Sequence, residues 1–246
     1  MREVCEIAAS VLADLCSEVK PGVTTYDLDQ MGKRLIEERG AVSACYNYKI
    51  GSKRYPAYTC ISVNEEVVHG IGSLKKVLRA GDIVSVDVSV EFNGFIGDNA
   101  KTVVIEPVAD EIRRLVKVTE EALYKGIEKA RPNARVGDIS HAIQVYVEGK
   151  GFSVVRDFVG HGVGRSIHEE PQIPNFGRPD TGPKLRRGMT LAIEPMVNLG
   201  SSDVEYAEDE WTVITVDRKP SAHFEHTVLI TDEFAEILTI PKKIAC

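Results

Sequence analysis

Residues 81–105 read GDIVSVDVSVEFNGFIGDNAKTVVI, two runs of strand-forming residues separated by Asn93-Gly94. An Asn-Gly pair between apolar runs is the strongest short signal of a β-hairpin with a two-residue turn. In the register that this turn imposes, Asp87 lies opposite Ala100. Asp87 and Asp98 are then diagonal neighbours on one face of the sheet, with Cα atoms about 7 Å apart. The alternative is a surface hairpin whose acidic residues are simply solvated. The apolar residues that flank Asp87 argue against this alternative.

Carboxylates in apolar runs recur further along the chain. Glu194 lies within TLAIEPMV at residues 190–197, which reads as a second buried strand. An ionised carboxylate is very costly to bury without a partner, so acids in such runs suggest bound cations. The candidate ligands are four carboxylates and one imidazole: Asp87, Asp98, His161, Glu194 and Glu225. This mixture suits a pair of divalent first-row metals better than structural zinc, which favours cysteine and histidine.

The chain also repeats itself weakly. LRAGDIVSVD at residues 78–87 aligns with LRRGMTLAIE at residues 185–194, and the alignment superposes the acids that end them. Asp98 before NAKTVVI similarly corresponds to Glu225 before HTVLI. We therefore predict a duplicated α+β unit with a metal pair on its pseudo-twofold axis, bridged by Asp98 and Glu225.

The apolar spacing predicts where the secondary structure lies. Helices are expected over residues 3–19, 28–36, 112–127 and 139–147, the second opened by a capping box of Thr24 and Asp27. Strands are expected over 59–64, 83–105, 189–198, 210–217 and 222–231, with a loop over 171–183. The length allows one domain or two, and the repeat favours a single domain of residues 1–246 whose pseudo-repeat halves, about 1–108 and 109–246, share one core.

The composition narrows the class of protein. The 246 residues are 43% hydrophobic and 27% charged, as in a soluble globular chain with a large core. A net charge of −7 argues against nucleic acid as the main partner. No apolar run approaches the ~20 residues that span a membrane, and no signal-peptide pattern opens the sequence. The five cysteines form no CxxC pair, so we expect free thiols and a cytoplasmic location.

The glycine-rich segment GHGVG at residues 160–164 surrounds a candidate ligand. It partly matches the dinucleotide motif GxGxxG, but Arg165 stands where that motif requires glycine. The glycines are instead expected to let backbone segments crowd around His161 while it binds metal.

Four further residues remain ambiguous on their own. His168 lies in HEEP, which lacks the second histidine of HExxH and so excludes that class of zinc peptidase. His168 and His69 both lie near glycines, and a lone histidine is more often structural than functional. Cys60 has no visible His-Asn arrangement, which favours a pocket wall over a nucleophile. Trp211 suits core packing and pocket lining equally well.

These motifs together resemble the type I methionine aminopeptidases, peptidases of the pita-bread fold, in their compact bacterial or organellar form. The resemblance runs from about Met1 to Ile240 and rests on KPGV (20–23), SAC (43–45), CISVNEEVVHGI (60–71), GDIVSVD (81–87), GD (97–98), GHGVGRSIHEEP (160–171), AIEPM (192–196) and SAHFEHT (221–227). It implies an α+β fold of pseudo-twofold duplicated αβ halves, with a central curved antiparallel sheet covered by helices.

The resemblance also implies roles for individual residues. The dinuclear ligands fall on Asp87, Asp98, His161, Glu194 and Glu225, for two divalent ions of cobalt, manganese, iron or zinc. The catalytic residues fall on His69, His168 and Glu194, the last as proton shuttle, and both histidines also contact substrate. The methionine pocket falls on Tyr55, Cys60, Ile167 and Trp211. Tyr55 is our choice of pocket tyrosine from the 46–58 loop. The segment from Ser43 to Cys60 is about four residues longer than in some relatives, and Ile167 replaces an aromatic residue or methionine.

The implied activity is removal of the initiator methionine from nascent peptides and proteins by a dinuclear metal-bound hydroxide. We expect a monomer. A prolidase or Xaa-Pro aminopeptidase would share the five ligands, but those chains usually carry an extra N-terminal domain. A dinuclear phosphoesterase would need a basic group for phosphate, and a non-catalytic relative that binds partners would be expected to have lost ligands.

Overall fold

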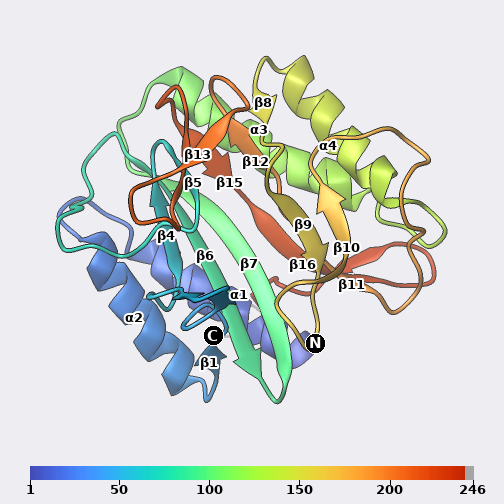
Figure 1. The fold of residues 1–246 in the computed structure, drawn as a ribbon, viewed down its shortest axis with the longest axis horizontal. Helices are drawn as coiled ribbons and strands as arrows, with labels where there is room; N and C mark the ends of the chain where they lie inside the picture. The colour runs from blue at the N-terminus through green and yellow to red at the C-terminus, as the bar shows by residue number, and fades with distance from the viewer. Residues whose placement is uncertain (242–246) are drawn as a thin grey trace, which may run out of the picture.

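The computed structural model describes residues 1–241 as a large antiparallel sheet with two pairs of helices packed against it (Figure 1). The described residues form four helices: α1 (Arg2–Ser17), α2 (Thr25–Glu38), α3 (Asp110–Ile127) and α4 (Val136–Gly149). The main sheet has the strand order β1-β6-β7-β16-β11-β9-β10, with β4 also paired to β6 and β17 to β16. Its strands are β1 (Val42–Ser43), β4 (Cys60–Val63), β6 (Ile83–Phe92), β7 (Phe95–Val104), β9 (Val159–Gly162), β10 (Glu169–Pro174), β11 (Thr190–Ile193), β16 (Glu225–Ile230) and β17 (Ala235–Ile237).

Three smaller sheets surround the main one, in the orders β15-β12-β8, β13-β14-β5 and β2-β3. Their strands are β2 (Lys49–Ile50), β3 (Lys53–Arg54), β5 (Glu66–Val68), β8 (Ser153–Val154), β12 (Met196–Asn198), β13 (Val204–Tyr206), β14 (Val213–Thr215) and β15 (Ser221–His223). No helix within residues 1–241 is both long and apolar enough to cross a membrane. The proposed division into halves near residue 108 stays a prediction.

The β6–β7 hairpin forms in the predicted register. Asn93 and Gly94 have φ values of 52° and 74°, the positive values that a tight hairpin turn requires at both central residues. Asp87 pairs with Ala100, as predicted. The local turn chemistry therefore sets the positions of Asp87 and Asp98 on the sheet.

The two faces of β6 have opposite characters. The buried valines Val84, Val86, Val88 and Val90 pack in the same cluster as α1. The residues between them are polar and belong to the opposite face, because side chains alternate along a strand. Gly97 of β7 lets α1 approach, since a Cβ there would lie 2.9 Å from the backbone of Cys5. Helix α1 thus covers one face of the hairpin and leaves the other face free for a site (Figure 1).

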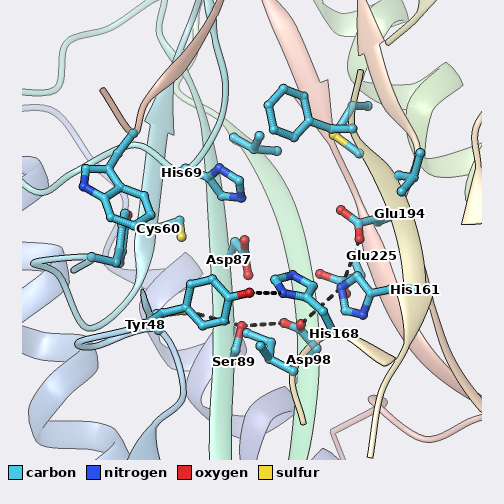
Figure 2. A pocket seen from close by; sticks show the side chains of 18 of the residues that line it. Tyr48, Cys60, His69, Asp87, Ser89, Asp98, His161, His168, Glu194 and Glu225 are labelled. Carbon is cyan, nitrogen blue, oxygen red and sulfur yellow. Dashed lines mark hydrogen bonds and ion pairs between the residues drawn. The ribbon is translucent and has the colours of Figure 1, made fainter. Parts of the chain in front are cut away.

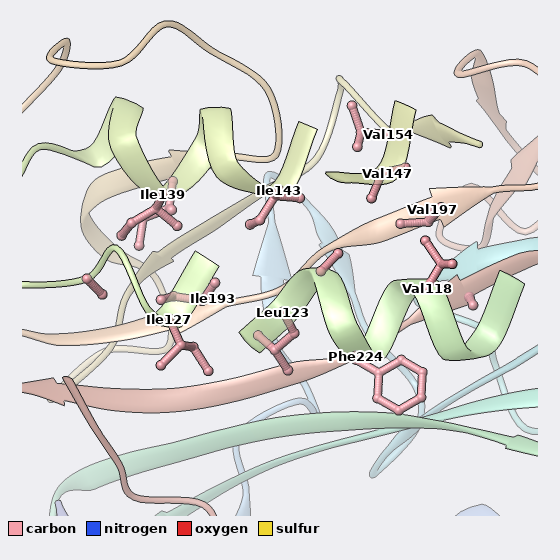
Figure 3. Close-up of a cluster of buried hydrophobic side chains, with 14 of the residues drawn as sticks. Val118, Leu123, Ile127, Ile139, Ile143, Val147, Val154, Ile193, Val197 and Phe224 are labelled. Atoms are coloured by element: carbon pink, nitrogen blue, oxygen red, sulfur yellow. The ribbon is translucent and has the colours of Figure 1, made fainter. Parts of the chain in front are cut away.

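The helices form as their sequences predict. Helix α2 begins with the expected capping box, in which Thr24 and Asp27 satisfy each other's backbone N–H groups. Helices α3 and α4 pack on each other, and Figure 3 shows Ile143 of α4 among the buried side chains of that interface. This cluster also takes in Val197 of β12 and Phe224, which lies between β15 and β16.

Three expectations for the second half of the chain are wrong. Residues 189–198 do not form one strand, because β11 ends at Ile193 and β12 begins at Met196 in another sheet. Pro195 lacks the N–H that would continue the ladder, so the chain changes sheets there. The run 222–231 is likewise divided at Phe224, and part of the predicted loop 171–183 belongs to β10, where buried Ile173 pairs with β9.

The α3–α4 interface provides a test of the packing. Ile143 is fully buried, whereas Val145, on the same helix, is 56% exposed. We expect Ile143→Ala to lower the free energy of unfolding by about 2–5 kcal/mol, because the truncation leaves a cavity. Val145→Ala should change it by less than about 0.5 kcal/mol. Urea denaturation of both variants measures the difference, and equal values would contradict the assigned packing.

Candidate active site

Five neighbouring strands of the main sheet bring the candidate ligands to one place (Figure 2). In the strand order β6-β7-β16-β11-β9 they are Asp87, Asp98, Glu225, Glu194 and His161, with Glu194 directly after the end of β11. The register explains why they converge. Ala100 of β7 pairs with Asp87 on one side and Glu225 on the other, and Ala192 of β11 pairs with His161. Ligands that are distant in the chain therefore meet on adjacent strands.

Glycines around His161 allow the strands to come this close. A Cβ on Gly160 would lie 2.4 Å from the carbonyl oxygen of Ala192, and one on Gly162 would lie 2.4 Å from that of Glu170. No side chain can be accommodated at such distances without moving the backbone. The crowding of backbone around His161 that GHGVG predicts is confirmed.

His161 faces the carboxylates with a defined ring nitrogen. Its Nδ1 lies 2.9 Å from the carbonyl oxygen of Gly162, which can only accept a hydrogen bond. The proton of the neutral ring therefore resides on Nδ1, and the lone pair is on Nε2. Nε2 lies 3.3 Å from Oε1 of Glu194 and 3.9 Å from Oδ2 of Asp98. A backbone-anchored imidazole of this kind is the usual form of a metal-binding histidine.

The four carboxylates are clustered and desolvated. Burial raises the pKa of Asp87 and of Glu225 well above the usual range, and the neighbouring Asp98 adds to both shifts. Burial also raises the pKa of Asp98, although His161 opposes this shift, and it raises the pKa of Glu194 to about 8. Protein groups alone therefore do not stabilise four negative charges here.

The donor set fits divalent cations. Oδ1 of Asp87 and Oε1 of Glu225 are buried without a hydrogen-bond partner among the described residues, which is rare for native side chains unless an ion or water binds them. Asp98, His161 and Glu225 offer ligand atoms that all lie within 4.8 Å of one another. Oxygen donors with a single imidazole suit a divalent first-row metal. Asp87 and Glu194 line the same cavity as this group.

Three further histidines surround the carboxylates. His69 has a φ of 60°, which is uncommon for a residue other than glycine, and its ring meets Phe158 edge-on at 5.7 Å. His223 is buried with Nε2 3.4 Å from Oε2 of Glu194. Burial lowers the pKa of both, and of His168, to about 4, although His168 is an exposed residue. All three are thus neutral near pH 7 and can each donate one hydrogen bond.

A cavity of about 270 Å³ contains the cluster, and one of its walls is apolar. The predicted pocket residues Tyr55, Cys60, Ile167 and Trp211 all line it. The rings of Tyr55 and Trp211 meet edge-on at 5.4 Å, and the Tyr55 hydroxyl donates to the carbonyl oxygen of Gly70 at 2.9 Å. A hydrogen bond with Cys45, together with burial, raises the pKa of the Cys60 thiol well above its usual range. Cys60 is therefore a neutral wall rather than an activated nucleophile.

Several residues of this cavity carry no recognisable signal in the sequence. Tyr48, Ile50, Phe158 and Met196 line it as well. The 46–58 loop is predicted to contribute one tyrosine to the pocket. In the structure it contributes two, Tyr48 and Tyr55. His223 was not predicted either, although it stands two residues before Glu225 in SAHFEHT. Every predicted site residue lines the cavity, including His69 and His168, while their individual roles stay predictions.

Comparisons with known proteins agree with this geometry. Residues 1–232 match the model of metallopeptidase family M24. Methionine aminopeptidase 1 of Bacillus subtilis is 49% identical over 97% of this chain and 94% of its own length. The crystal structure of a methionine aminopeptidase from Thermotoga maritima superposes with a TM-score of 0.93 at 47% identity, over 98% of this chain and 95% of that one.

A more distant structure shares the fold alone. The prolidase of Pyrococcus furiosus has a TM-score of 0.78 at 23% identity, covering 98% of this chain but 63% of that one. The expected pita-bread architecture, a curved antiparallel sheet backed by helices, is confirmed by these structures. The full-length matches show that this chain belongs to metallopeptidase family M24 and, within it, to the methionine aminopeptidases.

Proposed function

We propose that this protein removes the N-terminal methionine from nascent peptides and proteins by metal-dependent hydrolysis. The observation that carries the proposal is the convergence of four carboxylates and His161 from five adjacent strands, beside an apolar wall. The name shared by its full-length relatives supports methionine as the first residue of the substrate. We also propose that the protein acts in the cytoplasm as a monomer.

Two divalent ions are the proposed cofactors, drawn from cobalt, manganese, iron and zinc. Asp98 and Glu225 would contact both ions, Asp87 would complete one site, and His161 with Glu194 the other. Bound divalent ions would supply Lewis acidity and ease the ionisation of a water molecule near pH 7. The orphaned oxygens of Asp87 and Glu225 support this assignment, because cations would satisfy them.

The remaining roles belong to proton transfer and hydrogen bonding. Glu194 lies between His161 and His223, and it is proposed to take the proton from the attacking water and pass it to the leaving amine. His168 and His69 are proposed to donate hydrogen bonds to the scissile amide and its developing negative charge. Their neutrality near pH 7 leaves each with a donor but no charge.

Two rival activities are disfavoured by specific observations. None of the described residues that line the cavity is lysine or arginine, so a phosphate ester would find no cation to hold it. Prolidases share the fold at much lower identity and in longer chains. Assays of Met-Ala-Ser, an Xaa-Pro peptide and a phosphate ester, each with and without added metal, distinguish the three activities.

The ligand assignment leads to a first test. Asp98→Asn should lose bound metal and turnover while keeping its fold, because the amide is nearly isosteric but carries no charge. Glu91→Gln, an exposed change in the same hairpin, is the matched control and should retain both. Metal analysis by mass spectrometry and circular dichroism measure the outcome. An Asp98→Asn protein with two bound ions and normal turnover would contradict the assignment.

The role of His168 leads to a second test. His168→Ala should lower kcat by about 10²–10³, the scale of losing one transition-state donor. Its metal content should equal that of the unchanged protein, because His168 is proposed to contact substrate and not metal. Loss of an ion from this variant would mean that His168 binds metal as His161 is proposed to do, and would contradict its assignment as a substrate contact.

The apolar wall leads to a third test. Competition between Met-, Leu- and Lys-initiated tripeptides should favour Met over Leu only modestly. The ratio of their kcat/KM values should correspond to a difference in transition-state free energy of about 1–3 kcal/mol. Lys should be rejected far more strongly, because its charge would be buried beside Cys60 and Trp211 without a partner. Equal cleavage of the Met and Lys peptides would mean that the pocket lies elsewhere.

A further inference from the structure

Tyr48 makes a direct hydrogen bond to one of the proposed catalytic histidines. Its hydroxyl oxygen lies 2.7 Å from Nδ1 of His168, and the two rings meet edge-on at 5.2 Å (Figure 2). On another side the His168 ring contacts His161, with ring centroids 4.5 Å apart. The two contacts hold a ring whose residue otherwise reaches solvent at the edge of the cavity.

The backbone holds Tyr48 firmly in place. Its N–H donates to the carbonyl oxygen of Cys45 at 2.9 Å, and its own carbonyl accepts from the N–H of Tyr55 at 2.8 Å. The Cys45 thiol in turn donates to the Ser89 hydroxyl in β6 at 3.4 Å. The loop that carries Tyr48 is therefore anchored to the strand next to the carboxylates. A side chain on such a base can fix the orientation of a partner.

The contact fits either tautomer of His168, because the Tyr48 hydroxyl can donate to Nδ1 or accept from Nδ1–H, and the two cases leave different groups on Nε2. A neutral imidazole carries one proton, on Nδ1 or on Nε2. A tyrosine hydroxyl that donates to Nδ1 requires that nitrogen to be the acceptor, so the ring proton resides on Nε2. Nε2–H is then the free donor of His168. Without the hydroxyl, the ring could exchange tautomers and rotate.

We propose that Tyr48 is a positioning residue that holds His168 in its Nε2–H form and aims this donor at the scissile peptide. The proposal rests on the function proposed above for His168. It adds that Tyr48 affects the reaction only by orienting His168. Its hydroxyl, and not its ring, is the group that matters. A role confined to lining the pocket would depend on the ring alone.

The first measurement separates the hydroxyl from the ring. Tyr48→Phe should lower kcat on Met-Ala-Ser by about 3- to 10-fold, the scale of one hydrogen bond, with KM changed less than about twofold. Tyr46→Phe is the matched control, since Tyr46 lies in the same loop but stacks on Tyr58 outside the cavity. This control should keep the original kcat. An unchanged kcat in Tyr48→Phe would overturn the proposal.

A double-mutant cycle tests whether Tyr48 acts through His168. In a His168→Ala background, Tyr48→Phe should have almost no further effect, because the partner is gone. A full additional loss there would mean that Tyr48 acts by another route. If His168→Ala alone keeps the original rate, the role proposed for His168 fails, and the tautomer measurement below still tests the positioning.

The tautomer can be measured independently of activity. Nitrogen-15 NMR of the zinc-loaded protein should show His168 with a protonated Nε2 and an acceptor Nδ1. In Tyr48→Phe the two nitrogen shifts should move toward each other as both tautomers become populated, and Tyr46→Phe should leave them unchanged. Identical His168 shifts in the original protein and in Tyr48→Phe would overturn the proposal, whatever the kinetics show.

Discussion

The burial of four clustered carboxylates is the constraint on which this structure depends. The pairing of β7 with both β6 and β16 forces Asp87, Asp98 and Glu225 together, and the end of β11 adds Glu194. Burial raises the pKa of each of these acids, and neighbouring carboxylates add to the shift at Asp87 and Glu225, so the protein by itself disfavours their ionised forms. Cations reverse that preference, because they attract the charges and satisfy the orphaned oxygens. The same sheet therefore specifies both the fold and the need for metal.

The sheet separates stability from chemistry by its two faces. The valines of β6 pack with α1 on one face, while Asp87 and Ser89 line the cavity on the other. Strand alternation makes this division automatic, because neighbouring side chains point in opposite directions. Close backbone approach supports both faces: Gly97 admits α1, and Gly160 admits β11 beside His161. Rigid strands can then hold the candidate ligands at fixed distances, which loops would do less accurately.

The sequence predicted those parts of the site that depend on local rules. Asn93-Gly94 set the register that makes Asp87 and Asp98 neighbours, and the glycines of GHGVG indicated crowding around His161. Prediction failed where local signals were weak. The apolar run through Glu194 reads as one strand, yet Pro195 ends it, so Glu194 lies in the break between two sheets. Tyr48 could not be predicted, because nothing in the local sequence distinguishes it from the other tyrosines of its loop.

The sequence by itself determined the β6–β7 hairpin, the start of α2 at the Thr24 capping box, and the types of residue available as ligands. Turn chemistry, capping and side-chain alternation act over only a few residues. Only the tertiary structure decided which distant groups meet. It brought Tyr48 to Nδ1 of His168 and His223 to Oε2 of Glu194. Such contacts depend on how separate strands and loops pack, and the energies that choose one packing over another are spread over the whole core.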